Sequence, residues 1–287
     1  MRGRGGTGPA GLGGDQVEGR RAVLELLAAG RRPVRRLVVA EGLDPSPQLD
    51  RIEELAVARK IPLQTVSPAR LAALARTDAP QGVVALTRAI EPEPLEELCT
   101  RGDRGGALPF LLVVAGITDP RNLGSLLRSA EGAGVTGVVL PRHRSAHLSP
   151  AVAKVAAGAV EHLAFALVPG IAGALVTMAG LGVRSIGLAA EARRSIYELD
   201  VEDQAIALVV GGEERGLPAL VRRRCDDLAA IPQHGALSSL NAGAAGAVAC
   251  FEVARRRLAP ARASAAASRG SSRARATRGS LAGASEG

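Results

Sequence analysis

The chain has 287 residues, 47% of them hydrophobic, and a formal net charge of +8. This length can bury a core in one large or two modest domains, and we expect two. The charge alone does not indicate a nucleic-acid-binding fold. Residues 1–14 and 259–287 together hold seven arginines and one glutamate, which leaves only +2 for residues 15–258.

Both ends of the chain are predicted not to fold. Residues 1–14 are glycine-rich and contain no apolar run, which argues against a secretory signal and favours a flexible segment. Residues 259–287 consist mainly of alanine, serine, arginine and glycine, so we expect a disordered tail. Its arginines either add nonspecific affinity for RNA or only keep the end of the chain in solution.

Residues 15–90 are predicted to form a small α/β domain. Ser46 and Ser67 each precede a proline, a pattern typical of helix starts, because serine caps free N–H groups and proline suits the first helical position. The expected helices are Val17–Ala29, Pro47–Lys60 and Pro68–Ala75, and the expected strands are Arg36–Ala40, Leu63–Val66 and Gly82–Thr87.

A linker is expected over residues 91–108, with a short helix around Leu95–Cys99. Residues 109–258 are predicted to form a second, larger α/β domain. Its apolar runs do not alternate with polar residues, which indicates a parallel sheet covered on both faces. The expected strands are Phe110–Ala115, Gly137–Leu140, Leu163–Val168, Ser185–Leu188, Ala205–Val210 and Leu228–Ile231.

A membrane span and a metal site are both disfavoured. The uncharged stretch over residues 163–183 is long enough to span a bilayer, but Pro169-Gly170 interrupts it, so a strand, a turn and a buried helix are expected instead. Cys99, Cys225 and Cys250 have no paired spacing for zinc or for a redox dithiol. They fit a reduced cytoplasmic protein without a bound metal.

The last helix is predicted from about Ser239 to Leu258. Four of its apolar residues fall on one stripe, namely Leu240, Ala244, Val248 and Phe251. All three phenylalanines, Phe110, Phe165 and Phe251, are expected to be buried. Gly243 and Gly246 each cost about 1 kcal/mol in a helix interior, which indicates that another part of the chain approaches this helix closely.

Three polar, glycine-bearing turns that follow apolar strands carry the functional signal, and together they indicate one composite site. They lie in residues 117–132, 209–217 and 231–241. In the first, a helix is expected to start near Asn122, and Asn122 and Arg128 are the candidate site residues. The ordinary alternatives are a helix cap for Asn122 and a solvated surface charge for Arg128.

The second and third turns hold a glycine pair and a helix start. Gly211-Gly212 allows a tight turn and the close approach of a ligand, and Glu213 follows at once. The G-x-G-x-x-G spacing is absent, which disfavours a nicotinamide oxidoreductase. Ser239 and Asn241 precede or open the last helix, where capping is the ordinary role and an anionic group is also favoured.

Together the three turns resemble the SPOUT superfamily of RNA methyltransferases, in its SpoU/TrmH branch of ribose 2′-O-methyltransferases. The motifs N-x-G-S-x-x-R-S-A, G-G-E-E-R-G-L and S-S-L-N occur in order within about 110–258. Residues 15–90 are similar to the L30e-like substrate-binding domain of one subgroup, through Val17-Glu-Gly-Arg-Arg-Ala-Val-Leu and Ala79-Pro-Gln-Gly-Val-Val. Pro80 stands where that subgroup usually has histidine.

The resemblance implies methyl transfer from S-adenosylmethionine to an RNA ribose, most closely to a guanosine of 23S rRNA, by a homodimer with a deep trefoil knot in its second domain. Transfer RNA, another 23S rRNA nucleotide such as an antibiotic-resistance site, and a noncatalytic rRNA-binding role are the alternatives. By position, the catalytic residues would be Asn122, Arg128, Glu213, Ser239 and Asn241. The backbone of Gly211, Ile231 and Leu240 would bind the adenosyl group.

Arg128 is expected to bind a phosphate or stabilise the developing alkoxide rather than act as the base, because a guanidinium keeps its proton and has no acceptor. Glu213 and Asn241 would orient Arg128 and the substrate, and water or an RNA phosphate oxygen would take the proton. Aromatic residues make up only 1% of the chain, so we expect shape and phosphate contacts to select an exposed RNA loop.

Overall fold

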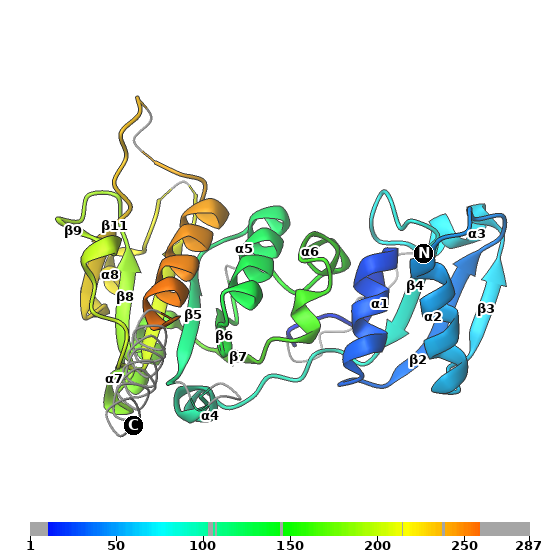
Figure 1. Ribbon diagram of the computed structural model, residues 1–287, viewed down its shortest axis with the longest axis horizontal. Coiled ribbons are helices and arrows are strands. Elements are labelled where there is room, and N and C mark those ends of the chain that lie inside the picture. The colour runs from blue at the N-terminus through cyan, green and yellow to red at the C-terminus, as the bar shows by residue number, and fades with distance from the viewer. Residues whose placement is uncertain are drawn as a thin grey trace, which may run out of the picture.

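The computed structural model describes residues 11–102, 106, 108–143, 146–213, 215–236 and 239–258. Residues 1–10 and the predicted tail 259–287 lie outside this range. Two α/β domains lie next to each other along the long axis of the molecule (Figure 1). Helices α1 (Arg20–Ala29) and α6 (Pro150–Val155) stand between the two sheets.

The first domain is built on a four-stranded sheet in the order β1-β4-β2-β3. Its strands are β1 (Gln16–Glu18), β2 (Val34–Ala40), β3 (Leu63–Val66) and β4 (Val83–Thr87). Helices α1 and α2 (Pro47–Ala58) cover one face, and α3 (Pro68–Leu74) lies on the other. The predicted serine caps are confirmed, since Ser46 accepts from the Leu49 N–H at 3.3 Å and Ser67 accepts from the Arg70 N–H at 3.4 Å.

The prediction of one helix over Val17–Ala29 is wrong at its start. Gln16–Glu18 is a strand paired antiparallel with β4, and α1 begins only at Arg20. Side chains alternate in a strand, so Val17 packs in the core under α1 while Glu18 is buried on the opposite face. There the Glu18 carboxylate accepts from the backbone N–H groups of Arg76 at 2.6 Å and Thr77 at 3.1 Å.

The described parts of two segments predicted as a flexible start and a linker pack on the second domain. Leu12 is 1% exposed, packs in the core of that domain and accepts from the Leu148 N–H at 2.9 Å. Helix α4 (Leu95–Thr100) buries Leu98 and Cys99 under the second sheet. Each segment holds very few large apolar residues among glycines, prolines and charges, so the composition gives no sign of this burial.

The second domain contains a seven-stranded, wholly parallel sheet in the order β7-β6-β5-β10-β8-β11-β9. The strands are β5 (Phe110–Ala115), β6 (Gly137–Pro141), β7 (Phe165–Val168), β8 (Arg184–Leu188), β9 (Arg194–Ser195), β10 (Ile206–Gly211) and β11 (Asp227–Ala230). Because the strands are parallel, their carboxyl ends meet at one edge, where open α/β sheets bind ligands.

Helices cover both faces of this sheet, as its uninterrupted apolar strands predict. One face packs against α5 (Pro120–Gly132), α6 and the last helix, residues 242–258. The other packs against α4, α7 (Ile171–Gly180) and α8 (Ala219–Arg224). The uncharged stretch is indeed a strand, a turn and a buried helix, namely β7, Pro169-Gly170 and α7. In the described part of the chain, no helix is long and apolar enough to cross a membrane.

The last helix begins at residue 242 rather than at Ser239 and presents its small residues to the core. A Cβ added to Gly246 would lie 2.3 Å from Leu126 Cδ1 of α5, so the glycine permits the predicted close approach. The prediction that Phe251 is buried is wrong, because its side chain is 51% exposed. The inner face must be small to admit α5, and the large apolar residues therefore point outward.

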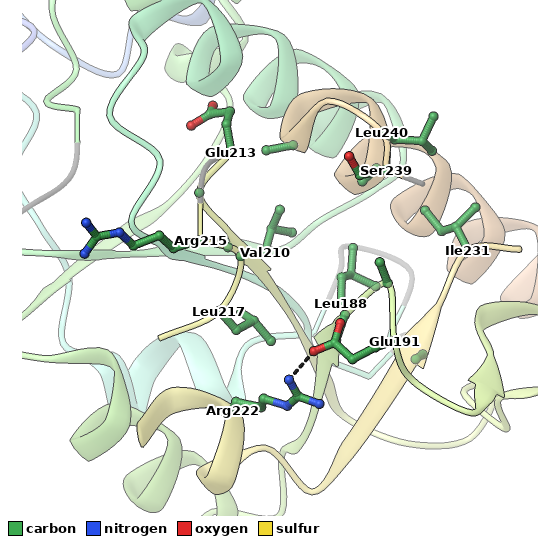
Figure 2. A pocket seen from close by; sticks show the side chains of 18 of the residues that line it. Leu188, Glu191, Val210, Glu213, Arg215, Leu217, Arg222, Ile231, Ser239 and Leu240 are labelled. Atoms are coloured by element: carbon green, nitrogen blue, oxygen red, sulfur yellow. Dashed lines mark hydrogen bonds and ion pairs between the residues drawn. The ribbon is translucent and has the colours of Figure 1, made fainter. Parts of the chain in front are cut away.

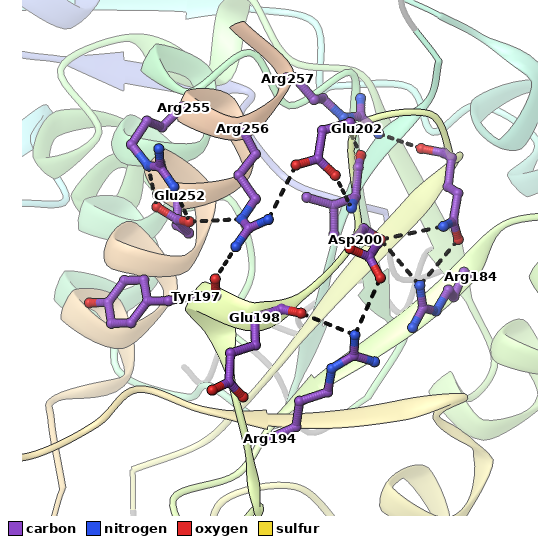
Figure 3. A network of polar contacts seen from close by, with 12 residues as sticks. Arg184, Arg194, Tyr197, Glu198, Asp200, Glu202, Glu252, Arg255, Arg256 and Arg257 are labelled. Atoms are coloured by element: carbon purple, nitrogen blue, oxygen red, sulfur yellow. Dashed lines mark hydrogen bonds and ion pairs between the residues drawn. The ribbon is translucent and has the colours of Figure 1, made fainter. Parts of the chain in front are cut away.

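Arg257 fixes the end of this helix to the rest of the domain (Figure 3). Its guanidinium donates to the carbonyl oxygens of Leu108 at 2.7 Å, Pro109 at 3.2 Å and Gln204 at 2.6 Å. It also lies 5.3 Å from the ring centroid of Phe110, within the range of a cation–π contact. The helix end is thus held to the start of β5 and to the segment before β10.

An ion pair joins the two domains. Arg32 of the first domain donates to both carboxylate oxygens of Glu161 in the second, at 2.9 and 2.5 Å, and the side chains are only 10% and 2% exposed. The same guanidinium donates to the carbonyl oxygen of Gly14 at 2.6 Å. A two-pronged pair of this kind has one favoured geometry, so it fixes the first domain against the second.

We expect Glu252→Gln to lower the free energy of unfolding at neutral pH by about 1–3 kcal/mol, because Glu252 is largely buried and accepts from both Arg255 and Arg256. The hydrogen bond from Arg255 is the main cause that lowers the pKa of Glu252. A carboxyl whose pKa is lowered in the folded state stabilises that state above its unfolded pKa and loses this effect as pH falls.

The difference between the variant and the natural chain should therefore shrink on acidification, as measured by urea unfolding over a series of pH values. Glu54→Gln is the matched control, since the Arg51–Glu54 pair is 58% and 64% exposed and should contribute at most about 1 kcal/mol. A Glu252→Gln effect that stays constant from neutral to strongly acidic pH would contradict this account.

Candidate active site

The loops after β5, β8, β10 and β11 converge at the carboxyl edge of the second sheet. The first of them leads into α5, which begins at Pro120 rather than near Asn122. Asp119 caps this helix by accepting from the Arg121 N–H at 2.9 Å. Asn122 is therefore not the cap, and its amide is free for other contacts in the first helical turn.

Asn122 links the three predicted turns through a continuous chain of hydrogen bonds. Its side-chain oxygen accepts from Nδ2 of Asn241 at 2.9 Å, and its own Nδ2 donates to Oε1 of Glu213. These residues are 91 and 119 positions from Asn122 in the sequence. The structure thus brings together one predicted side chain from each turn, and we refer to Asn241, Asn122 and Glu213 as the amide relay.

The direction of this relay is set by the last helix. Oδ1 of Asn241 accepts from the backbone N–H groups of Gly243 at 2.9 Å and Ala244 at 3.2 Å, which is the geometry of a helix N-cap. The amide nitrogen of Asn241 must then face Asn122, which in turn must direct its own nitrogen at Glu213. Glu213 accepts the last hydrogen bond of the relay. Asn241 therefore has both of its expected roles, because it caps the last helix and also belongs to the site.

A pocket of about 380 Å³ lies beside the relay. The predicted cofactor residues Gly211, Ile231 and Leu240 all line it, and so do Glu213 and Ser239. Figure 2 shows Ser239 and Leu240 near the start of the last helix, across the pocket from Leu217. Glu213 stands at the rim with its carboxylate directed toward α5, where Asn122 lies.

The glycine pair after β10 is required by close backbone packing. A Cβ on Gly212 would lie 2.3 Å from the carbonyl oxygen of Gly116, in the loop after β5. A Cβ on Gly211 would lie 2.2 Å from the carbonyl carbon of Gly216. The loops after β5 and β10 are thus in direct backbone contact, which sets Glu213 beside α5.

The structure adds charged pocket residues that the sequence analysis did not single out. Glu191, after β8, forms an ion pair with Arg222 of α8 at the end of the pocket away from Glu213 (Figure 2). Arg215 also lines the pocket. The turn that carries Glu191 contains no glycine and no recognisable motif, so only its position after a parallel strand could have indicated it.

Arg128 is not part of this pocket. It lies on the exposed side of α5, and its side chain makes no hydrogen bond or ion pair with a described residue. The six positions between Asn122 and Arg128 correspond to about one and two-thirds helical turns, so the two side chains leave α5 in different directions. Within one chain, Arg128 does not join the relay.

The thiols of this domain are unsuited to nucleophilic chemistry. Burial, with a smaller effect of Asp226, raises the pKa of Cys225 to about 11, and burial raises that of Cys250 to about 12. Both thiols therefore stay protonated at neutral pH. Among the described residues there is also no group of three His, Cys, Asp or Glu side chains that could hold a metal ion.

Comparison with known proteins matches both domains to one kind of protein. The model of the SpoU rRNA methylase family matches residues 109–251, and the model for RNA 2′-O ribose methyltransferase substrate binding matches residues 16–93. The 23S rRNA (guanosine-2′-O-)-methyltransferase RlmB of Pseudomonas aeruginosa is 37% identical over 246 residues, covering 85% of this chain and 97% of that protein.

Two further likenesses agree with these matches. YacO of Bacillus subtilis, assigned to the TrmH family of tRNA/rRNA methyltransferases, is 35% identical over 243 residues, covering 85% of this chain and 96% of that protein. The solved AdoMet-bound rRNA methyltransferase of Sinorhizobium meliloti superposes with a TM-score of 0.69 at 24% identity, covering 84% of this chain and 86% of that one. At that identity the likeness concerns the fold.

We expect Gly212→Ala to destabilise the protein by about 1–3 kcal/mol, because the new methyl group meets a backbone oxygen that cannot move aside cheaply. Gly173→Ala in α7 is the control, since nothing lies within 4 Å of the added carbon and alanine favours a helix. Urea unfolding measures both variants. Equal stability of the two would show that the loops after β5 and β10 are not held in contact.

Proposed function

The chain belongs to the SpoU rRNA methylase family, and we propose that it transfers the methyl group of S-adenosylmethionine to the 2′-hydroxyl of a guanosine in 23S rRNA. The amide relay at the rim of the pocket is the observation that carries this proposal. The name of the Pseudomonas relative supports the choice of base and of RNA. Because the substrate is ribosomal RNA, we expect the enzyme to act in the cytoplasm.

The pocket has the size and lining that the adenosyl cofactor requires. Its volume of about 380 Å³ falls within the range of about 300–1,000 Å³ typical of small-molecule sites. Leu188, Ile231 and Leu240 supply apolar side chains for a flat base, and the adjoining loops supply backbone donors and acceptors. When bound, the cofactor supplies an activated methyl group on sulfur. Family membership is also the basis on which we expect the trefoil knot in these loops.

We assign to Glu213 the positioning of the ribose hydroxyl. One of its carboxylate oxygens is held by Asn122, and its other oxygen makes no hydrogen bond or ion pair with a described residue. Glu213 is exposed at the pocket rim, so the free oxygen can accept a hydrogen bond from the substrate. A fixed acceptor of this kind orients the attacking oxygen toward the methyl group, and such alignment contributes several kcal/mol to catalysis. Ser239 lines the same pocket and stays a candidate substrate contact.

We propose further that two copies of the chain form a dimer through the outer side of the last helix. The stripe Leu240, Ala244, Val248 and Phe251 is exposed, with exposed fractions of 42% for Leu240, 37% for Val248 and 51% for Phe251. A contiguous apolar stripe of this kind is typical of a protein interface.

The same interface accounts for Arg128. Arg128 is one helical turn before Gly132, and the Phe251 ring lies 3.6 Å from the Cβ position of Gly132, so Arg128 lies on the side of α5 that adjoins the stripe. We infer that Arg128 reaches the site of the second copy, where it binds an RNA phosphate or the developing alkoxide.

The test of the function is transfer of radiolabelled methyl groups from S-adenosylmethionine to purified 23S rRNA, 16S rRNA and tRNA, followed by mapping of ribose methylation. We expect label in 23S rRNA at a guanosine, and none with a Glu213→Ala variant. Label confined to tRNA would show that tRNA, rather than 23S rRNA, is the substrate, which agrees with the broader name of the Bacillus relative. RNA binding without any transfer would favour a noncatalytic role.

Asn241→Asp should separate the cap of the last helix from the relay. Aspartate still accepts from Gly243 and Ala244 and is a good N-cap, so the melting temperature should change little. It cannot donate to Asn122, so the relay to Glu213 is lost and turnover should fall about tenfold or more. Thermal unfolding and steady-state methylation measure the two effects. Normal turnover would remove the relay from the mechanism.

If Arg128 acts in the second copy of a dimer, Arg128→Ala and Glu213→Gln should complement each other. Each variant alone should be nearly inactive, whereas a randomly reassociated mixture contains mixed dimers with one intact site. The mixture should recover about a quarter of the natural rate. No recovery, with mixed dimers verified by differential tags, would place Arg128 in its own chain's site or outside catalysis.

A further inference from the structure

The first domain has an incompletely covered sheet face. Helices α1 and α2 cover one side of the sheet, but among the described residues only the short α3 packs on the other. Arg36 lies on this second side, in line with Val38 and paired across to Leu86 of β4. Two shallow hollows flank Arg36 and share it as a lining residue.

Arginines surround these hollows. Arg35 and Arg36 line the first hollow, and Arg36 and Arg70 line the second. The side chains of Arg35 and Arg70 are exposed and make no hydrogen bond or ion pair with a described residue. Arg36 is exposed too and donates only to the neutral side chain of Gln64, at 3.2 Å. We refer to Arg35, Arg36 and Arg70 as the arginine face.

Little negative charge faces these guanidinium groups. Asp15 is the only acidic residue that lines either hollow among the described residues, and it is paired with Arg76 at 3.1 Å. On the α1 and α2 side, Arg51 is paired with Glu54 and Arg59 donates to the carbonyl oxygen of Ala28, while the exposed Arg21 makes no hydrogen bond or ion pair with a described residue. The arginine face therefore holds positive charge that the protein itself does not neutralise.

The arginine face leads toward the second domain. Ala89, the residue after Arg88, lines the first hollow and also a pocket at the domain junction. That pocket is bordered by Arg31 of the first domain and Phe165 of the second. The first hollow thus borders the junction of the two domains at the start of β7, next to the Arg32–Glu161 pair.

We propose that the arginine face binds the phosphodiester backbone of the RNA substrate, an inference that rests on the proposed function. Guanidinium groups match phosphate oxygens in charge and in paired geometry. No aromatic residue lines either hollow, so backbone contacts rather than base stacking carry the affinity. The face then adds affinity that does not depend on sequence, while the choice of nucleotide is made at the pocket.

The test compares two triple variants of equal charge change in the full chain. Arg35→Gln/Arg36→Gln/Arg70→Gln removes the arginine face. Arg21→Gln/Arg51→Gln/Arg59→Gln removes one arginine from α1, one from α2 and the one that follows α2 as its C-cap. Fluorescence anisotropy with a labelled single-stranded RNA of mixed sequence measures affinity over a range of salt. Calorimetric binding of S-adenosylhomocysteine checks that the second domain is intact in each variant.

We expect the first variant to bind RNA at least about tenfold more weakly at low salt. The slope of log affinity against log salt should become shallower by about 2, because each of the three lost phosphate contacts contributes about 0.7 for a single strand. The second variant should keep near-natural affinity. Arg35→Lys/Arg36→Lys/Arg70→Lys should bind more tightly than the glutamine variant and more weakly than the natural chain, because lysine keeps the charge but loses the paired geometry.

Equal loss in both glutamine variants, or no loss in the first, would overturn the proposal, and so would a lysine variant as weak as the glutamine one. No loss would also leave an acidic protein as the better partner for this face. If the natural chain methylates 23S rRNA while the first variant binds and methylates normally, only the arginine face is refuted. If the natural chain neither binds nor methylates RNA, the proposed function fails with it.

Discussion

The candidate site depends on the orientation of one amide group, that of Asn241. The backbone of the last helix holds its oxygen, so its nitrogen can only face Asn122, and Asn122 can only donate to Glu213. An amide that could turn over would present either an oxygen or a nitrogen to the carboxylate. Formation of the last helix fixes the orientation of the Asn241 amide. The fold therefore determines that a nitrogen, rather than an oxygen, faces the Glu213 carboxylate.

The parts of the fold that follow from local pattern were predictable. Phe110–Ala115 is uniformly apolar and is a central strand of a parallel sheet, as predicted. The serines before Pro47 and Pro68 cap helices as expected, because capping involves only residues close in sequence. The convergence of the three turns was also foreseen, since strand ends in a parallel sheet share one edge and each turn carries the polar and glycine residues that a site requires.

The remaining features depend on contacts between distant segments. The residues next to Leu12 in the sequence do not indicate that it is buried. Its burial depends on contact with the distant residue Leu148. Phe251 is a large apolar residue of the kind expected in a core. However, the close approach of Gly246 to α5 turns the helix face with small side chains inward and leaves Phe251 exposed. The separation of Arg128 from the relay follows from helical geometry, because six positions along α5 turn the two side chains in different directions. The arginine face likewise arises from β2 and α3 together.

The glycine contact between the last helix and α5 has a mechanical consequence. A Cβ on Gly243 would lie 3.2 Å from the backbone oxygen of Asn122, and helix backbones this close have less freedom to slide or tilt than helices that meet through long side chains. Asn241 stands at the start of one of these helices and Asn122 in the first turn of the other. The two amides are therefore carried by a single stiff body, which fixes the position of the group that donates to Glu213.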